Sequence, residues 1–552
     1  MSQLNFANNK TCDILNHFSS QPAEGRPKKC CACNGKTGAC KNCSCVKNNK
    51  RCTSCAPHFH KRCTNVDFVL ASSQPICAPL VPQVKACPSS SICNYFSKSS
   101  IRCVKFIPKA CRNDSAECFL EICDALTKNS CDINSWCKLL LMPHHCFKAP
   151  TRGGIRNNNA KVMQRNIQLF KNFTLPQLLN VPTSDSSHSR QSNLSSEKHI
   201  KRVCGKVEEG NIRAAVRLLV DEVSVAPHSN DTLEQLSNKH PQKQNNFSYN
   251  VQDYPPFFVS TEDISNALQS FPNGSAGSVD GLTPQYLKDM FLNVPESVSK
   301  DRNLIRLSNF LYAIINHDIP ASIKPAFFGA RLLALKKKCG GVRPIAIGNC
   351  LRRLAAKLIN TYASRLYFKS LFLPTQFGAG ATCGSEFVIH STRSFVQNNP
   401  DAVILKIDFA NAFNSVDRSW LLSEANKLKI PRLKFITNAY DQNSSLFYRD
   451  VVIPSQNGVQ QGDPLGPFLF CLAIQPIIQS LNSPLNLWYM DDGIIGGTQN
   501  VVMHDYNTIQ SECLKIGLSL NVSKCEIFNG RDPNPLTNPI SIFFVHRLLK
   551  IQ

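Results

Sequence analysis

Apolar and polar positions form regular patterns mainly in the C-terminal half of the chain. The segment AVILKID (402–408) is a nearly continuous run of aliphatic residues that ends in an acid, and it predicts a buried central strand with Asp408 at its end. The segment LWYMDDGII (487–495) is apolar on both sides of Asp491 and Asp492, and it predicts a hairpin with the two acids at its turn. Because Asp492-Gly493 is also an ordinary hairpin turn signal, this segment alone leaves a purely structural interpretation open.

Helical and unstructured segments follow from the same pattern. The segment LGPFLFCLAIQPIIQSL (465–481) predicts a buried helix that begins after Pro464, and GNIRAAVRLL (210–219) predicts an amphipathic helix. Residues 151–200 are first basic and then rich in serine, which predicts a linker with little to bury. The apolar run from Pro464 to Ile478 is short and contains Gln475, so we expect no membrane span.

The N-terminal region carries most of the cysteines. Ten of the 27 lie between Cys12 and Cys63, and ten more lie between Cys77 and Cys146. The first group contains a twelve-residue repeat, in which the spacing C-x-C-x6-C-x2-C occurs twice and shares one cysteine. With one cysteine added downstream, the repeat predicts a zinc cluster bound by Cys31, Cys33, Cys40, Cys43, Cys45, Cys52, Cys55 and Cys63. The second group has no CxxC pair, so buried thiols are at least as good an interpretation as a second metal site.

The chain opens without a basic segment and apolar core, so no secretory signal is visible, and zinc thiolates in a reducing compartment fit better than disulfides. We therefore expect an intracellular protein of the nucleus, the cytoplasm or both. The formal net charge is +24, from 62 Lys and Arg against 38 Asp and Glu. An excess this large favours a nucleic acid as the partner, with a solvated basic surface as the alternative.

Carboxylates that converge from separate strands are the ligands needed for two-metal phosphoryl chemistry, in which the two ions lie about 3.5 to 4 Å apart. Mg²⁺ favours such oxygen ligands and keeps waters and substrate phosphates as its other partners. Asp408 and Asp491 are the first candidates as ligands, and Asp492 is the less direct third carboxylate.

Four motifs, DFANAF, QGDPLGP, YMDD and GLSLNVSKCEIF, occur in the order and approximate spacing of reverse transcriptases. They most resemble those of non-LTR, LINE-type retrotransposons, and the resemblance covers roughly residues 260 to 530. It implies a right-hand polymerase, of α+β architecture with fingers and palm, that extends a DNA primer on an RNA template with dNTPs and two Mg²⁺ ions. The cysteine repeat loosely resembles the CXC modules of tesmin-type DNA-binding proteins.

The resemblance also implies roles for single residues. Phe413 matches the aromatic gate that excludes a ribose 2′-hydroxyl, and Gln461 with Gly462 matches the segment beside the incoming nucleotide. Arg343 matches the arginine that holds the triphosphate, and its planar fork suits phosphate. Lys524 matches the lysine proposed to protonate pyrophosphate as it leaves.

Arg352, Arg353 and Lys357 have helical spacing, and we expect them to track template phosphates. The segment LPTQFGAGATCGSE (373–386) also matches the family, at Gln376 and Gly378.

The predicted organisation is multidomain: a zinc module (26–65), a cysteine-containing region of unknown fold (66–150), a linker (151–200), a helical lead-in (201–260), the polymerase domain (261–530) and a truncated C-terminus (531–552). No endonuclease is visible, and little or no thumb follows the last motif. A truncated or catalytically inactive nucleic-acid-binding protein derived from a retroelement therefore remains the alternative to an active enzyme. The sequence does not specify the oligomeric state.

Overall fold

The computed structural model describes ten stretches of the chain: 88–99, 101–149, 159–180, 196–208, 210–220, 225–243, 256–294, 300–337, 340–427 and 433–529. All of them belong to the second of two compact units, which spans Ala86–Gln552. The cysteine module predicted for residues 26–65 and the C-terminus predicted for 531–552 lie outside the described residues. Among the described helices, none is both long and apolar enough to cross a membrane.

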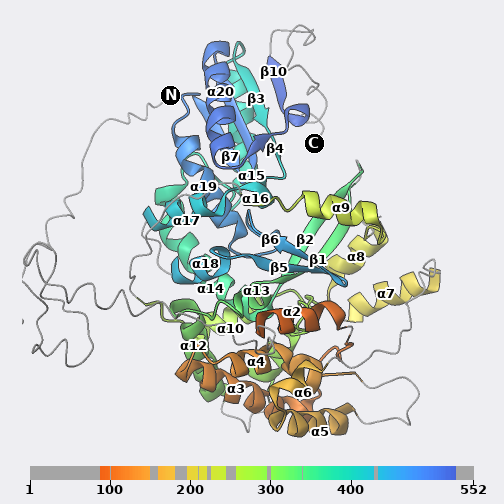
Figure 1. Ribbon diagram of the computed structural model, residues 1–552. Helices are drawn as coiled ribbons and strands as arrows, with labels where there is room; N and C mark the ends of the chain where they lie inside the picture. Colours follow the sequence, from red (N-terminus) through yellow and green to blue (C-terminus); the bar gives the residue numbers. More distant parts are fainter. Residues whose placement is uncertain are drawn as a thin grey trace, which may run out of the picture. The chain divides into compact units, whose positions relative to one another are not determined.

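A four-stranded antiparallel sheet, in the order β10-β3-β8-β7, carries the predicted acidic segments (Figure 1). Helix α20 contacts β3 and β8, α15 contacts β7, and α19 packs against α20. The predicted buried strand, hairpin and apolar helix are therefore confirmed. The bounds are β3 (Val403–Ile407), β7 (Leu485–Tyr489), β8 (Asp492–Gly497), β10 (Glu526–Asn529), α15 (Gly384–Asn398), α19 (Gly466–Gln479) and α20 (Gln499–Lys515).

A second sheet has the order β2-β1-β5-β6, and two further short strands, β4 and β9, pair with each other. Strands β1 and β2 form an antiparallel hairpin, and β1 pairs with β5 in parallel. One face of this sheet buries Ala330, Leu332 and Ala334 together with Leu236 of α9. The bounds are β1 (Ala330–Lys336), β2 (Val342–Gly348), β5 (Ser444–Tyr448), β6 (Val451–Ser455), β4 (Phe409–Ala410), β9 (Ser519–Leu520) and α9 (Asn230–Asn238).

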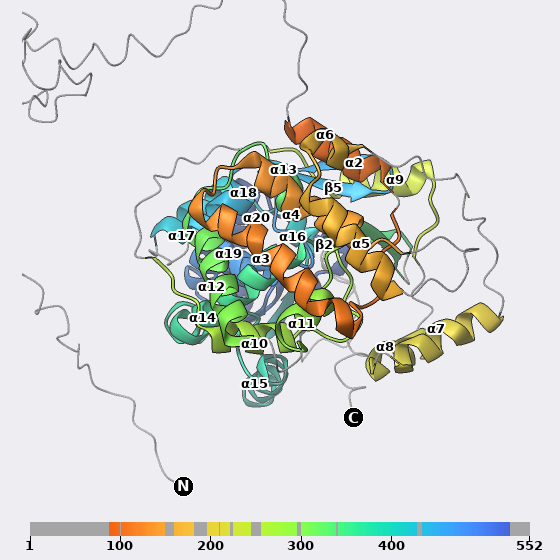
Figure 2. The same cartoon turned by 90° about the horizontal axis from the view of Figure 1, so that it is seen from below.

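The described residues of the region predicted as 66–150 are largely helical and share their core with elements of the C-terminal half of the chain. Trp136 of α4 stacks edge-on against Phe327 with 5.1 Å between ring centroids, and Phe96 of α2 meets Phe447 of β5 at 6.0 Å. Helix α3 lies beside both α4 and α12, as Figure 2 shows from below. The bounds are α2 (Pro88–Lys98), η3 (Lys109–Cys111), α3 (Arg112–Lys128), α4 (Ile133–Cys146) and α12 (Lys300–Asn316).

The linker predicted for residues 151–200 is wrong over its middle part. Helices α5 (Asn159–Lys171) and α6 (Leu175–Leu179) form there, and α5 buries Met163, Ile167 and Phe170 against the helical core. These three positions have the i, i+4, i+7 spacing of one helix face. Because most other residues of this segment are polar, its average composition did not indicate the narrow apolar stripe of the helix.

The cysteines described between Cys93 and Cys146 are free thiols, most of them buried. Burial raises the pKa of Cys137 to about 11 and that of Cys103 to about 12, so these groups are protonated at neutral pH. The interpretation as buried thiols is therefore confirmed for five of these cysteines, namely Cys111, Cys118, Cys123, Cys137 and Cys146, whereas Cys131 is exposed.

The remaining elements complete the lead-in and the connections between the sheets. Helix α8 confirms the amphipathic helix predicted from residues 210–219. The bounds are α7 (Ser196–Glu208), α8 (Ile212–Val220), α10 (Thr261–Gln269), α11 (Pro284–Phe291), α13 (Lys324–Phe327), α14 (Cys350–Leu371), α16 (Ala412–Ser415), α17 (Arg418–Lys427), α18 (Leu433–Tyr440) and η4 (Val522–Lys524).

Candidate active site

Asp408 directly follows β3 at the edge where the sheet carries its acidic residues. The pairing of β3 with β8 ends at Ile407 and Gly493, so the next position on each strand brings Asp408 beside Asp492. The Nδ2 of Asn521 donates to Oδ1 of Asp408 at 3.0 Å, and the Asn521 backbone N–H donates to the Asp408 carbonyl at 2.8 Å. These two bonds fix both the backbone and the carboxylate.

Asp491 lies in a two-residue turn with Met490, between the paired ends Tyr489 and Asp492. Met490 has a φ of 58°, which is uncommon for a residue other than glycine. The buried amide of Gln376 holds this conformation, because its Oε1 accepts from the Met490 N–H at 2.8 Å and its Nε2 donates to the Met490 carbonyl at 3.2 Å. Gln376 therefore clamps the turn that presents Asp491.

Gly493 is not part of this turn, although the Asp-Gly pair suggests one. It is the second residue of β8 and lies opposite Trp488 of β7. A Cβ atom at this position would lie 2.5 Å from the Trp488 indole, so only glycine fits beneath the ring. The structural alternative for Asp492-Gly493 is thus wrong, and the glycine makes room for a tryptophan in the core.

The three carboxylates share one electrostatic environment. Partial burial raises the pKa of Asp491, and the neighbouring charges of Asp492 and Asp408 raise it further. Partial burial also raises the pKa of Asp492, to which Asp408 adds, while Lys406 and Lys524 oppose the shift. The mutual repulsion shows that negative charge is concentrated at one edge of the sheet.

Two lysines therefore face the acids. Lys524, in η4, is the residue predicted from the last motif, and the structure places its charge near Asp492. Lys406 was missed, although the sequence held a signal: it is the one cation in an otherwise apolar strand, two residues before Asp408 and hence on the same face. Lys406 also pairs with Glu526 of β10 at 3.7 Å.

Arg343 lies on β2 with an exposed side chain, and its charge lowers the pKa of Asp491. The Gln461–Gly462 segment docks on the same strand, because the Gln461 carbonyl accepts from the Ala346 N–H at 2.8 Å. Gly462 has a φ of 122°, and a Cβ atom there would lie 2.4 Å from the Ala346 carbonyl oxygen. The second sheet thus brings Arg343 near Asp491 and holds Gln461 and Gly462 on the same strand.

Phe413 projects from the short helix α16, five residues after Asp408. Its ring stacks on Phe470 of α19 with 4.7 Å between centroids and 18° between planes. The backbone is held as well, since the Phe413 carbonyl accepts from the Val459 N–H at 2.6 Å. One face of the ring is therefore fixed by the core, and the side chain remains only partly buried.

Comparison of the sequence with known proteins agrees with this arrangement of Asp408, Asp491 and Asp492. Residues 334–538 match the reverse transcriptase (RNA-dependent DNA polymerase) family. A retrovirus-related Pol polyprotein from a type-2 retrotransposable element of Drosophila melanogaster is 25% identical over 293 residues, which cover 48% of this chain and 26% of that protein. The chain therefore matches about a quarter of the length of that relative.

Among solved structures, the chain is similar to an apo telomerase from Candida tropicalis, with 13% identity, a TM-score of 0.28, and coverage of 37% of this chain and 45% of that one. A similarity this low does not bear on function.

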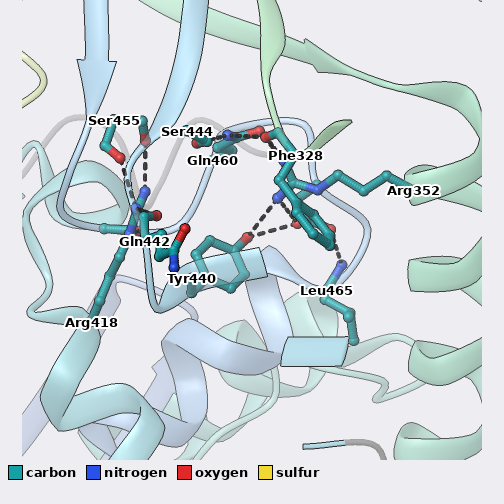
Figure 3. A network of polar contacts seen from close by, with 11 residues as sticks. Phe328, Arg352, Arg418, Tyr440, Gln442, Ser444, Ser455, Gln460 and Leu465 are labelled. Atoms are coloured by element: carbon teal, nitrogen blue, oxygen red, sulfur yellow. Dashed lines mark hydrogen bonds and ion pairs between the residues drawn. The ribbon is translucent and has the colours of Figure 1, made fainter. Parts of the chain in front are cut away.

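A buried polar network joins segments within the region that matches the reverse transcriptase family, residues 334–538 (Figure 3). Arg352 of α14 is 1% exposed, and its Nη2 pairs with Asp463 Oδ2 at 2.6 Å. Its Nη1 donates to Oε1 of Gln460 at 2.6 Å, while the Tyr440 hydroxyl donates to Asp463 at 2.6 Å. Because Gln460 and Asp463 bracket Gln461 and Gly462, the network fixes both ends of the segment that docks on β2.

The template contact expected for Arg352 is wrong, whereas those expected for Arg353 and Lys357 stay predictions. Arg352 is enclosed in the core and cannot reach a nucleic acid. Arg353 donates to the Ala276 carbonyl at 2.9 Å, and Lys357 donates to Ser270 at 2.8 Å; both cations also lie over the Phe271 ring. Helical spacing alone did not distinguish a buried arginine from an exposed one.

Metal binding follows from the donor set of the carboxylates. Within the described stretches, no three His, Cys, Asp or Glu side chains are grouped closely enough to hold a metal ion as they stand. Asp408, Asp491 and Asp492 nevertheless supply the oxygen ligands that Mg²⁺ prefers, and their mutual repulsion is of the kind that a cation relieves. The donor set fits Mg²⁺. The eight cysteines predicted to bind zinc lie outside the described residues.

Proposed function

We propose that this chain is an RNA-directed DNA polymerase of a non-LTR retrotransposon, which adds dNTPs to a primer 3′-hydroxyl on an RNA template. The observation that carries the proposal is the convergence of Asp408, Asp491 and Asp492 at one sheet edge, with Arg343 close to Asp491. The family match over residues 334–538 supports it independently.

Each residue around the carboxylates has a task in this reaction. Asp408 and Asp491, with Asp492 as the third carboxylate, would hold two Mg²⁺ ions, which supply charge stabilisation to the attacking and leaving oxygens. Arg343 binds the triphosphate through its guanidinium fork. Lys524 donates a proton to the departing pyrophosphate, and Lys406 offsets part of the carboxylate charge before substrate arrives.

Selection of the sugar depends on Phe413. The stack on Phe470 prevents the ring from rotating away, so a ribose 2′-hydroxyl would meet a fixed wall. The backbone of Gln461 and Gly462, which is docked on β2, supports their proposed place beside the incoming nucleotide. We therefore propose dNTPs as the substrates.

Primer extension tests the proposal, with a poly(A) template, an oligo(dT) primer, dTTP and Mg²⁺. Replacement of Asp491 and Asp492 by asparagine keeps the side-chain shape and removes the charge that holds the metal. Because charge stabilisation by a metal contributes several kcal/mol, incorporation should fall by about a thousandfold or more. Unchanged incorporation by the double variant would refute the assignment of the acids.

A second candidate is a catalytically inactive protein in which the cysteine module contacts nucleic acid. The regular cysteine spacing and the interleaved lysines of residues 26–63 favour this contribution. We propose that the eight cysteines bind Zn²⁺. Thiol titration and zinc analysis of the purified chain test the metal, and nucleic-acid binding that survives deletion of residues 1–65 would remove the module from this account.

A further inference from the structure

A cavity of about 450 Å³ is lined by none of the three carboxylates. Its wall comes from the segment after α2, from α4, from the loop before α11, and from β1 and β5. Of the described residues that line it, none is an aspartate or a glutamate. The polymerising reaction proposed above does not use this cavity.

Three arginines from separate segments line the cavity: Arg102, Arg331 and Arg449. Arg102 and Arg449 are exposed, and Arg449 is held in a left-handed conformation (φ 56°) at the turn between β5 and β6. The Nε of Arg331 is buried and has no hydrogen-bond partner among the described groups. The Asp280 carboxyl interacts with Arg331, and burial raises the pKa of Asp280 to about 7, so it offsets the charge of the arginines only in part.

The rest of the wall combines aromatic side chains with close backbone. Phe96 and Phe447 line the cavity and meet edge to face, with ring centroids 6.0 Å apart. Gly281 has a φ of 76°, and a Cβ atom there would lie 3.0 Å from the ring of His144. The rings of Phe96 and Phe447 are almost fully buried, so they give the cavity an apolar back wall and not an open stacking face. Arginines bind phosphates, so the combination suits a nucleotide whose base lies against the apolar wall.

Arg331 in the cavity and Arg343 near Asp491 lie on the same face of the β1–β2 hairpin. Arg343 is paired with Leu335, and Arg331 lies four residues before Leu335 on the same strand, so the two arginines share a face. Their separation along the strand is about 13 Å, at roughly 3.3 Å per residue. The opposite face of the hairpin is buried against α9.

We propose that this cavity binds one nucleotide of a single-stranded nucleic acid. The flanking phosphates bind Arg102 and Arg449 at the mouth, and the base or its own phosphate meets the unpartnered Nε of Arg331 inside. This site is separate from the carboxylate site, and its occupation requires neither Mg²⁺ nor a dNTP.

Binding of a fluorescent twelve-nucleotide oligo(U) to the full chain without added Mg²⁺ or dNTP, measured by anisotropy over a range of salt concentrations, tests the proposal. The test variant is Arg102→Ala/Arg449→Ala, and the charge-matched control is Lys128→Ala/Arg165→Ala, which changes two exposed cations of α3 and α5 that do not line the cavity. Thermal unfolding of each variant confirms that it is folded.

Each phosphate contact to a single strand contributes about 0.7 to the slope of log K against log salt, so the test variant should lose about 1.4 from its slope. At 0.1 M salt this corresponds to affinity weaker on the order of tenfold or more, and the control should match the wild type. Equal slopes for the two variants would refute the site. Displacement of the oligo(U) by uridine monophosphate from the wild type, but not from the test variant, would reassign the cavity to free nucleotides and overturn the proposal of a strand.

Discussion

Arg352 provides the sharpest test of how the reverse transcriptase region is held together. Replacement by methionine keeps the length of the side chain and leaves Asp463, 8% exposed, with an unpaired charge. Asp463 would keep the Tyr440 hydroxyl, and Gln460 would lose the guanidinium donor at its Oε1. Removal of one partner from a buried ion pair costs about 3–5 kcal/mol, so Arg352→Met should destabilise the chain by that amount.

The matched control is Arg353→Met, one residue further along α14. The Arg353 guanidinium makes one hydrogen bond to a backbone carbonyl and lies over Phe271 nearer the surface, so its loss should cost about 1 kcal/mol. Urea unfolding followed by tryptophan fluorescence compares the two. With a slope of about 3 kcal/mol/M or more, the Arg352 variant should lose about 1 M from its midpoint.

A double variant separates the ion pair from general damage. Asp463→Asn removes the charge that Arg352→Met leaves unpaired, so Arg352→Met/Asp463→Asn should be more stable than the sum of the single changes by about 1–3 kcal/mol. If Arg352→Met unfolds at the same urea concentration as Arg353→Met but binds template RNA more weakly, Arg352 contacts nucleic acid. That result would refute the assignment of Arg352 to a buried ion pair with Asp463.

Three further predictions concern the site itself. Phe413→Ala should raise NTP incorporation relative to dNTP incorporation by roughly 10- to 100-fold in primer extension, because the wall against the 2′-hydroxyl is gone; an unchanged ratio would exclude the gate. The pKa of Asp491 is higher in the folded chain than in the unfolded chain, so the folded chain binds more protons between these two pKa values. The free energy of unfolding therefore falls as the pH rises from the unfolded pKa through the folded pKa. Asp491→Asn should therefore raise the melting temperature at pH 7 to 8 without divalent metal, and the gain should shrink toward pH 4; a gain that is constant with pH would contradict the linkage. Gly493→Ala should cost about 1–3 kcal/mol or more in urea unfolding, because its Cβ would overlap the Trp488 ring; a neutral effect would show that the indole can move.

The elements around the acids could be predicted because their signals are local. A run of aliphatic residues that ends at Asp408, and two apolar segments that flank Asp491 and Asp492, each fit only a few buried strand arrangements. Their pairing in one sheet follows once both strands are buried. The positions of Arg343 and Lys524 near the acids depended on the resemblance, since neither residue stands out by pattern.

The contacts that the sequence did not reveal join residues far apart in the chain. Gln376 clamps Met490 from 114 positions away, and Arg352 meets Asp463 across 111. An arginine or glutamine has the same letter whether it is exposed or buried, and only the fold decides which. The helix of residues 159–171 was missed for a related reason, since its three apolar residues gain meaning only against the core that they cover.

The helices between residues 88 and 180 extend the domain that the sequence predicts for residues 261–530. The sequence predicts a boundary near residue 261, yet Trp136 packs on Phe327 and Phe96 packs on Phe447, and all four belong to one continuous core. Arg306 of α12 adds ion pairs to Glu117 at 2.8 Å and Asp124 at 2.6 Å of α3. A fragment that starts at 261 would expose the apolar side of these contacts to water, and each Å² of exposed apolar surface costs about 25 cal/mol of folding free energy. The helices from residue 88 to 180 are therefore part of the folded polymerase unit, and the cavity with three arginines exists only because they close one side of it.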